Sequence, residues 1–167
     1  MSANDDSIAV VTTGGTIDKA YFDALSEYQI GESVVGRLLT MAKVTKPFRV
    51  LELFRKDSLD MTDSDRAKLH DTVASLKERR VLVTHGTDTM TLSAEALLNV
   101  HGKTIVFTGA LAPARFAESD AAFNLGMAFA ACQCMAAGVY IAMNGQVFDA
   151  GHVRKDRAQS RFVATDD

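Results

Sequence analysis

The sequence contains few cysteines and few prolines. Among its 167 residues there are two of each. Cys132 and Cys134 stand two apart in a helix-like segment, so they face different sides, which excludes a metal-binding pair and a disulfide framework. Such cysteine usage suits a reducing, cytoplasmic environment. Pro47 and Pro113 lie near the ends of expected elements, and no linker rich in proline, glycine or serine divides the chain.

Positive charge is not in excess either. Lysine and arginine number 18 against 21 aspartates and glutamates, which gives a formal net charge of -3. A mildly acidic chain has no general attraction for nucleic acid or for an anionic membrane surface. No apolar run is long enough to span a bilayer. The N-terminus, with Asp5 and Asp6, is acidic where a signal peptide would be basic. We therefore expect no nucleic-acid partner, no membrane partner and no signal peptide.

The overall composition is that of an ordinary globular protein. Hydrophobic residues make up 47% and charged residues 23% of the chain. This balance excludes disorder, collagen and low complexity as descriptions of the whole. The length allows one domain. We expect a single domain over residues 1–167, without internal repeats.

Short apolar runs alternate with longer amphipathic stretches. The runs predict strands at Ile8–Thr12, Phe48–Phe54, Arg80–Thr84, Thr104–Thr108 and Val139–Met143. Between them, helices are expected after a capping-box-like start at Thr62 and Asp65, and at Met90–Asn99, Ser119–Ala136 and Glu32–Ala42. This alternation predicts an α/β fold: a doubly wound, mostly parallel sheet with helices on both faces.

Polar residues follow each expected strand. In an open parallel sheet, ligands bind beyond the carboxyl ends of the strands, in the loops that come next. These segments are Thr12–Thr16, Arg55–Met61, His85–Thr89, Gly109–Pro113, and Asn144–Gly145 with Lys155 somewhat later. Hydroxyls, carboxylates and one lysine therefore converge on one edge of the sheet. We see no metal-ligand set and no basic stripe there.

The first of these loops carries two adjacent glycines, Gly14 and Gly15. Glycines permit unusual backbone angles and a close approach to a ligand. The spacing is not that of a dinucleotide-binding fingerprint, and no lysine precedes Thr16 as a P-loop requires. A generic anion site remains open. The loop is either a simple turn or the support of a nucleophilic Thr16 hydroxyl.

Other polar residues also have two interpretations. Thr87 and Asp88 can be a helix cap or part of a reactive group. His85 can be a general base or a hydrogen-bonded structural residue. Lys155 lies in a charge run that is typical of a solvated face. Tyr21 suits either a lid or an ordinary surface position. The histidines form no metal-binding pattern.

Two motifs together point to a known family. Thr13–Ile17 and His85–Met90 resemble the two signature motifs of bacterial-type L-asparaginases, which are threonine-nucleophile amidohydrolases. Each motif follows an expected strand, and the two are about seventy residues apart. Supporting segments are Ser58–Met61, Gly109–Pro113 followed by Asp120 and Phe123–Leu125, and Met143–Lys155. The resemblance extends from about Ile8 to Phe162.

The resemblance implies a role for each matching residue. Thr16 matches the nucleophile that attacks the side-chain amide, and Tyr21 matches the mobile-loop tyrosine that hydrogen-bonds it. Thr87, Asp88 and Lys155 match a second group, in which a carboxylate holds a lysine that polarises a hydroxyl. An alcohol is a poor nucleophile and needs such a neighbouring base or polarising network.

The resemblance also implies the substrate contacts. Ser58 would bind the α-carboxylate of the substrate, and Asp88 its α-ammonium. The N–H of Thr87, with Ala110 nearby, would stabilise the oxyanion. The other expected binding residues are Gly15, Asp57, Leu59, Asp60 and Gly86. The implied reaction converts L-asparagine to L-aspartate and ammonia through an acyl-enzyme, without metal or cofactor. The implied assembly is a homo-oligomer, a dimer or tetramer.

The sequence departs from the family pattern in three ways. The family chain is usually about twice as long, so we expect a short, single-domain form without the acidic residue that a neighbouring protomer's second domain lends. The Ile17–Ala20 segment before Tyr21 is short. Leu59 replaces a common glutamine, which predicts low glutaminase activity. Alternatives are a broader asparaginase-glutaminase, another small-amide amidohydrolase, or a non-catalytic amino-acid-binding module.

Overall fold

A six-stranded sheet forms the centre of the molecule. The computed structural model describes residues 6–166. The strand order is β4-β1-β5-β6-β7-β8, and all neighbours are parallel except β7 and β8. The strands are β1 (Ile8–Gly14), β4 (Phe48–Lys56), β5 (Arg80–Thr84), β6 (Thr104–Thr108), β7 (Gly138–Met143) and β8 (Gln146–Asp149). The expected α/β fold with a mostly parallel sheet is confirmed.

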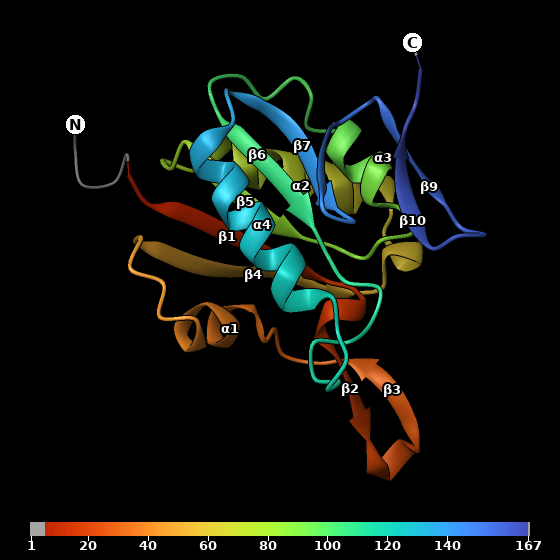
Figure 1. Ribbon diagram of the computed structural model, residues 1–167. Helices are drawn as coiled ribbons and strands as arrows, with labels where there is room; N and C mark the ends of the chain where they lie inside the picture. Colours follow the sequence, from red (N-terminus) through yellow and green to blue (C-terminus); the bar gives the residue numbers. More distant parts are fainter. Residues whose placement is uncertain (1–5, 167) are drawn as a thin grey trace.

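Helices cover both faces of this sheet (Figure 1). α1 (Val35–Met41) and α4 (Ala121–Cys134) pack on one face, and α2 (Asp63–Ser75) and α3 (Met90–Glu95) pack on the other. The inner strands β1, β5, β6 and β7 supply both cores, because successive side chains point to opposite faces. In β1, for example, Ile8 and Val10 lie in the α1/α4 core, while Ala9 and Val11 lie in the α2/α3 core.

The helix boundaries differ from the sequence expectation where tertiary contacts intervene. The capping box is confirmed, since Thr62 and Asp65 exchange hydrogen bonds at the start of α2. α1 begins at Val35, three residues later than expected, because the Val34 N–H donates to the buried Asp18 carboxylate at 3.0 Å. α3 ends at Glu95, four residues earlier than expected. Beyond it the chain continues in tighter turns, such as Leu98 N–H to Glu95 C=O.

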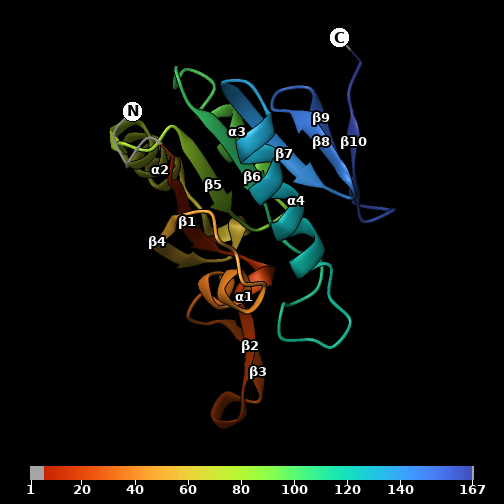
Figure 2. The same ribbon diagram turned by 60° about the vertical axis from the view of Figure 1, so that its left-hand side comes forward.

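Antiparallel pairs were missed by the sequence analysis. β8 returns beside β7 through Asn144 and Gly145, whose φ angles are 53° and 72°. This dipeptide is a typical hairpin signal. β2 (Lys19–Phe22) and β3 (Glu27–Ile30) form a hairpin that projects from the body in both views (Figures 1 and 2). β9 (Val153–Asp156) and β10 (Arg161–Ala164) form another, beyond β8.

The two cysteines form no disulfide bond. Cys132 and Cys134 are both free, one buried and the other exposed, as expected from their spacing. Burial raises the pKa of the Cys132 thiol to about 12.

No helix within residues 6–166 is both long enough and apolar enough to cross a membrane. The expectation about a signal peptide falls mainly on residues 1–5, which lie outside the described residues.

Candidate active site

Three loops meet at the carboxyl ends of β1, β4 and β5. Gly15 follows β1, Ser58 follows β4 and Gly86 follows β5. A Cβ atom on Gly15 would lie 2.4 Å from the backbone N of Gly86, and one on Gly86 would lie 2.6 Å from Cβ of Ser58. The three backbones are therefore packed directly against one another. All three were expected at this edge of the sheet from their places after the strands, and the structure brings them into contact.

The glycines are required by both conformation and space. Gly14 and Gly15 have φ angles of 102° and 85°, which L side chains rarely adopt. The Gly15 N–H donates to the Lys56 carbonyl at 2.9 Å, so the loop is tied to β4. On the other side, the Thr13 hydroxyl donates to the Thr84 carbonyl at 2.8 Å. Together these bonds fix the position from which Thr16 leaves the sheet.

A hydrogen-bonded group of three side chains lies beside this junction. Lys155 Nζ donates to Thr87 Oγ1 at 2.7 Å and to Asp88 Oδ1 at 2.8 Å. Thr87 and Asp88 follow β5, whereas Lys155 comes from β9, where it pairs with Phe162. Phe162 is buried in the α2/α3 core. Lys155 is thus held by a strand rather than placed in a solvated charge run.

The carboxylate in this group is surrounded by cations. The hydrogen bond and charge of Lys155 hold the pKa of Asp88 below its usual value, and the more distant charges of Arg157 and Lys19 act in the same direction. Arg157 Nε lies 4.0 Å from Asp88 Oδ1. Asp88 is therefore ionised at neutral pH and holds the Lys155 side chain against the Thr87 hydroxyl.

The structure places Thr16 and Tyr21 on the same segment but in different environments. Thr16 is partly exposed and opens the short turn that leads into β2. Tyr21 lies on the projecting β2–β3 hairpin, with 51% of its surface exposed. Its ring contacts Tyr28 at 5.3 Å, and Tyr28 contacts Phe116. Within the described residues Tyr21 makes no hydrogen bond to Thr16, so the structure does not bring this pair together.

The loop after β4 buries Ser58 and exposes the two residues that follow it. Ser58 is only 1% exposed, and its hydroxyl accepts the Thr89 N–H at a long 3.4 Å. Leu59 is 64% exposed, and Asp60 is also exposed. Asp57 caps this turn by accepting the Leu59 N–H, and its carboxylate lies 3.5 Å from Lys19. The ion pair links the base of the β2–β3 hairpin to this loop.

The structural interpretation of His85 is the correct one. His85 is fully buried, and Nδ1 lies 2.7 Å from the Gly86 carbonyl. Burial lowers its pKa to about 4, so the ring is neutral near neutral pH. A buried ring cannot reach a substrate at the sheet edge. His85 supports the loop that carries Thr87 and Asp88.

Two residues that the sequence analysis quoted without a role hold the loop after β6. Asp120 accepts the N–H groups of Leu111 and Ala112, and Asn124 donates to the Gly109 carbonyl at 2.9 Å. Both residues lie at the start of α4. They fix the buried Ala110 next to the edge of the sheet. Asp120 and Asn124 are four residues apart and therefore lie on the same face of a helix. This spacing was the signal in the sequence that could have pointed to their shared role.

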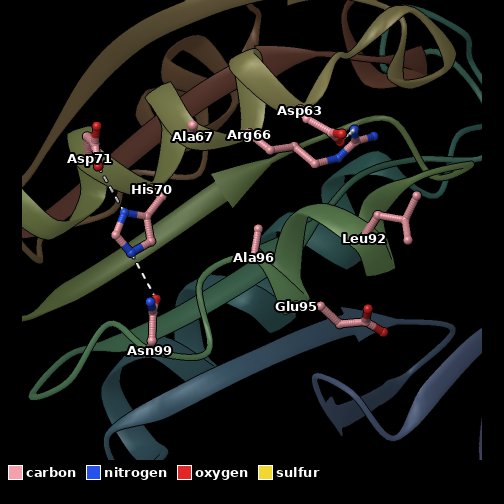
Figure 3. Close-up of a pocket in the computed structure, with 9 residues that line it drawn as sticks. All are labelled: Asp63, Arg66, Ala67, His70, Asp71, Leu92, Glu95, Ala96 and Asn99. Atoms are coloured by element: carbon pink, nitrogen blue, oxygen red, sulfur yellow. Dashed lines mark hydrogen bonds and ion pairs between the residues drawn. The ribbon is translucent and has the colours of Figure 1, made fainter.

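A hollow lies away from this group of residues, between α2 and α3 (Figure 3). At one end of the hollow His70 bridges Asp71 and Asn99, with ring-nitrogen distances of 3.0 and 2.8 Å. The hydrogen bond to Asp71 raises the pKa of His70. The hollow contains no hydroxyl or thiol nucleophile. Over residues 6–166, no cluster of His, Cys, Asp and Glu side chains is suited to hold a metal ion.

The chain is similar to several known proteins. The family model described as the N-terminal part of asparaginase matches residues 7–164. The chain belongs to the asparaginase family. It is 30% identical over 168 residues to a glutaminase-asparaginase of Acinetobacter glutaminasificans, covering 90% of this chain and 50% of that protein. It is also 30% identical over 155 residues to one component of a glutamyl-tRNA(Gln) amidotransferase of Pyrococcus abyssi, covering 85% of this chain and 34% of that one.

Solved structures show the same fold. The thermostable L-asparaginase of Thermococcus kodakarensis matches with a TM-score of 0.81 and 22% identity, and the probable cytoplasmic L-asparaginase of Campylobacter jejuni with 0.81 and 28%. Each match covers 95% of this chain and 51% of the other. The asparaginase-family chain described here thus spans about half the length, or less, of these relatives.

Proposed function

We propose that this chain hydrolyses the side-chain amide of L-asparagine, with Thr16 as nucleophile, to give L-aspartate and ammonia. The observation that carries the proposal is the Lys155–Thr87–Asp88 group, held beside the glycine junction from which Thr16 emerges. Membership of the asparaginase family supports it. The group combines a lysine, a hydroxyl and a carboxylate at hydrogen-bonding distance, which is the network an alcohol nucleophile needs.

The reaction would proceed in two steps. Thr16 attacks the amide carbon and forms a tetrahedral oxyanion, which the N–H groups of Thr87 and Ala110 stabilise. The amide nitrogen takes up the proton that the Thr16 hydroxyl has lost and leaves as ammonia, so that an ester to Thr16 remains. Water, activated through Thr87 and Lys155, then attacks the ester. L-Aspartate leaves, and the Thr16 hydroxyl regains its proton.

Leu59 bears on the choice between asparagine and glutamine. Its exposed side chain carries no hydrogen-bonding group, and only its N–H is engaged, by Asp57. Glutamine has one more methylene than asparagine and needs firmer placement of its amino-acid head. We propose low glutaminase activity for this reason. A broader asparaginase-glutaminase remains the second candidate, supported by the relative from Acinetobacter.

Ammonia release from L-asparagine and L-glutamine tests the proposal. Wild type, Thr16→Ala and Thr16→Ser are compared in parallel. We expect asparagine turnover in wild type, residual turnover with the serine hydroxyl, and none with alanine. Similar kcat/KM values for the two amides would reject the role of Leu59. If both amides bind without turnover, the chain is an amino-acid-binding module.

We further propose a homo-oligomer in the cytoplasm. The dimer or tetramer is an expectation from the family resemblance, and one structural relative is described as a probable cytoplasmic L-asparaginase. Light scattering behind size-exclusion chromatography measures the mass directly. A particle of 18.0 kDa would contradict the assembly.

A further inference from the structure

An amino-acid substrate needs a donor for its α-carboxylate that a ligand can reach. Ser58 has the matching position in the sequence, but it is 1% exposed and lies directly beneath Gly86. Its hydroxyl already faces the Thr89 N–H. The Ser58 hydroxyl has a single O–H donor, so it can give the substrate carboxylate at most one hydrogen bond, and only after the surrounding loop moves. The charge of the carboxylate therefore requires a further partner.

Arg157 is a cation that lies beside Asp88, the residue expected to bind the α-ammonium. Its Nη2 donates to the Asp88 carbonyl at 3.4 Å, and its Nε lies 4.0 Å from Asp88 Oδ1. The side chain is 65% exposed. Within the described residues these two long contacts are its only ones, so most of its N–H donors face outward. A guanidinium with free, coplanar donors matches the geometry of a carboxylate.

The other nearby cations are already engaged. Lys155 donates to both Thr87 and Asp88, and Lys19 is paired with Asp57 at 3.5 Å. Using either lysine for the substrate carboxylate would break an existing interaction. Arg157 needs no such exchange.

We propose that Arg157 binds the α-carboxylate of the substrate while Asp88 binds its α-ammonium. The two groups of an amino acid are attached to one carbon atom, so the residues that recognise them must be neighbours. Asp88 and Arg157 are neighbours of opposite charge at the site. The hydrogen bond from Lys155 occupies Oδ1 of Asp88, and no residue of the described chain bonds Oδ2. This inference rests on the proposed amide hydrolysis.

Three amides that differ by one charged group test the assignment. L-Asparagine has both charged groups, succinamate lacks the ammonium, and 3-aminopropanamide lacks the carboxylate. With Arg157→Gln we expect kcat/KM for L-asparagine and succinamate to fall by about tenfold, mainly through KM, which is the range of a charge-assisted hydrogen bond. The value for 3-aminopropanamide should stay constant or rise, because a repelling cation has been removed.

Arg161→Gln is the matched control. Arg161 lies on the same hairpin, in β10, and is exposed, but it has no contact with Asp88. The same charge is removed there, so all three amides should respond equally and weakly. Arg157→Lys keeps the charge without the planar donors and should lie between wild type and Arg157→Gln. Equal losses for the three amides in Arg157→Gln, or no loss, would overturn the proposal.

Ligand binding separates this inference from the proposed function. Calorimetry with L-aspartate and with β-alanine, which differ by the α-carboxylate, is carried out on wild type and on Arg157→Gln. If wild type hydrolyses no amide, the proposed function fails. The role of Arg157 still stands if the variant loses affinity for L-aspartate alone. It falls if the variant binds both ligands as wild type does, or if wild type binds neither.

Discussion

Replacing Gly15 by alanine changes the contact on which the candidate site depends. The Gly15 backbone has φ 85° and ψ -176°, a region that is essentially restricted to glycine. Its hydrogen atoms face the Gly86 backbone, and an added Cβ would lie 2.4 Å from N and 2.5 Å from Cα of Gly86. Both neighbours are backbone atoms of a buried loop, so neither can move aside cheaply.

The expected cost is the sum of two effects. Holding a residue with a Cβ in this backbone region costs about 1–3 kcal/mol. Forcing extra volume into a packed region costs about 1–3 kcal/mol more. We expect Gly15→Ala to lower the free energy of unfolding by about 4 kcal/mol, which lowers the melting temperature by roughly 8–16 °C in a domain of this size. Amide hydrolysis should fall further, since Thr16 is displaced relative to Thr87.

Gly102→Ala separates the two effects. Gly102 has a φ of 75°, but a Cβ there would meet nothing within 4 Å. This variant should lose only the backbone term, about 1–2 kcal/mol, and should keep its activity. Urea denaturation and calorimetry provide the stabilities, and ammonia release provides the activity. If Gly15→Ala were no less stable than Gly102→Ala and equally active, the loops after β1 and β5 would not touch as described.

Further predictions concern stability and reactivity. The pKa of His85 is about 4 in the folded protein against 6.5 normally. Between these two pH values the unfolded chain therefore binds the proton more readily than the folded chain does. The free energy of unfolding should therefore fall by about 3 kcal/mol as the pH drops from 6.5 to 4, and His85→Gln should flatten that slope in urea titrations. Under native conditions a thiol reagent should modify Cys134 alone, because burial raises the pKa of Cys132 to about 12; modification of both by mass spectrometry would contradict this. Gly126→Ala, in the middle of α4 with open space around it, should raise the melting temperature, by roughly 2–4 °C for a gain of about 1 kcal/mol.

The parallel strands could be predicted because each carries its own signal. Arg80–Thr84 and Thr104–Thr108 were expected with the bounds that the structure shows, since both are continuous apolar runs buried on both faces. The β2–β3 hairpin has no such signal. Most of its residues are exposed, so no alternation of apolar and polar side chains marks it. Its pairing is made by backbone hydrogen bonds, which the sequence does not display.

The candidate site was predictable in part for a similar reason. Residues that follow strands, such as Thr16 and Thr87, are placed by the topology of the sheet. Lys155 comes from β9, whose position depends on Phe162 being buried across the ladder, and the local sequence shows only a charge run. Arg157 acts through a contact with Asp88, far away in the sequence, and Asp120 acts through the loop that precedes α4. Of these three residues, the family resemblance assigned a role to Lys155 alone.

The elements of the site differ in how firmly the core holds them. The Thr87–Asp88 loop is fixed by the buried His85, and Lys155 is fixed by the strand that Phe162 anchors. Tyr21, by contrast, lies on a hairpin whose own contacts are mostly exposed. A network that shuttles a proton loses efficiency when its distances vary, so it belongs on anchored elements. An element that admits substrate must open, and opening costs least where little surface is buried. The division between the anchored lysine group and the exposed hairpin therefore suits the amide hydrolysis proposed for this edge of the sheet.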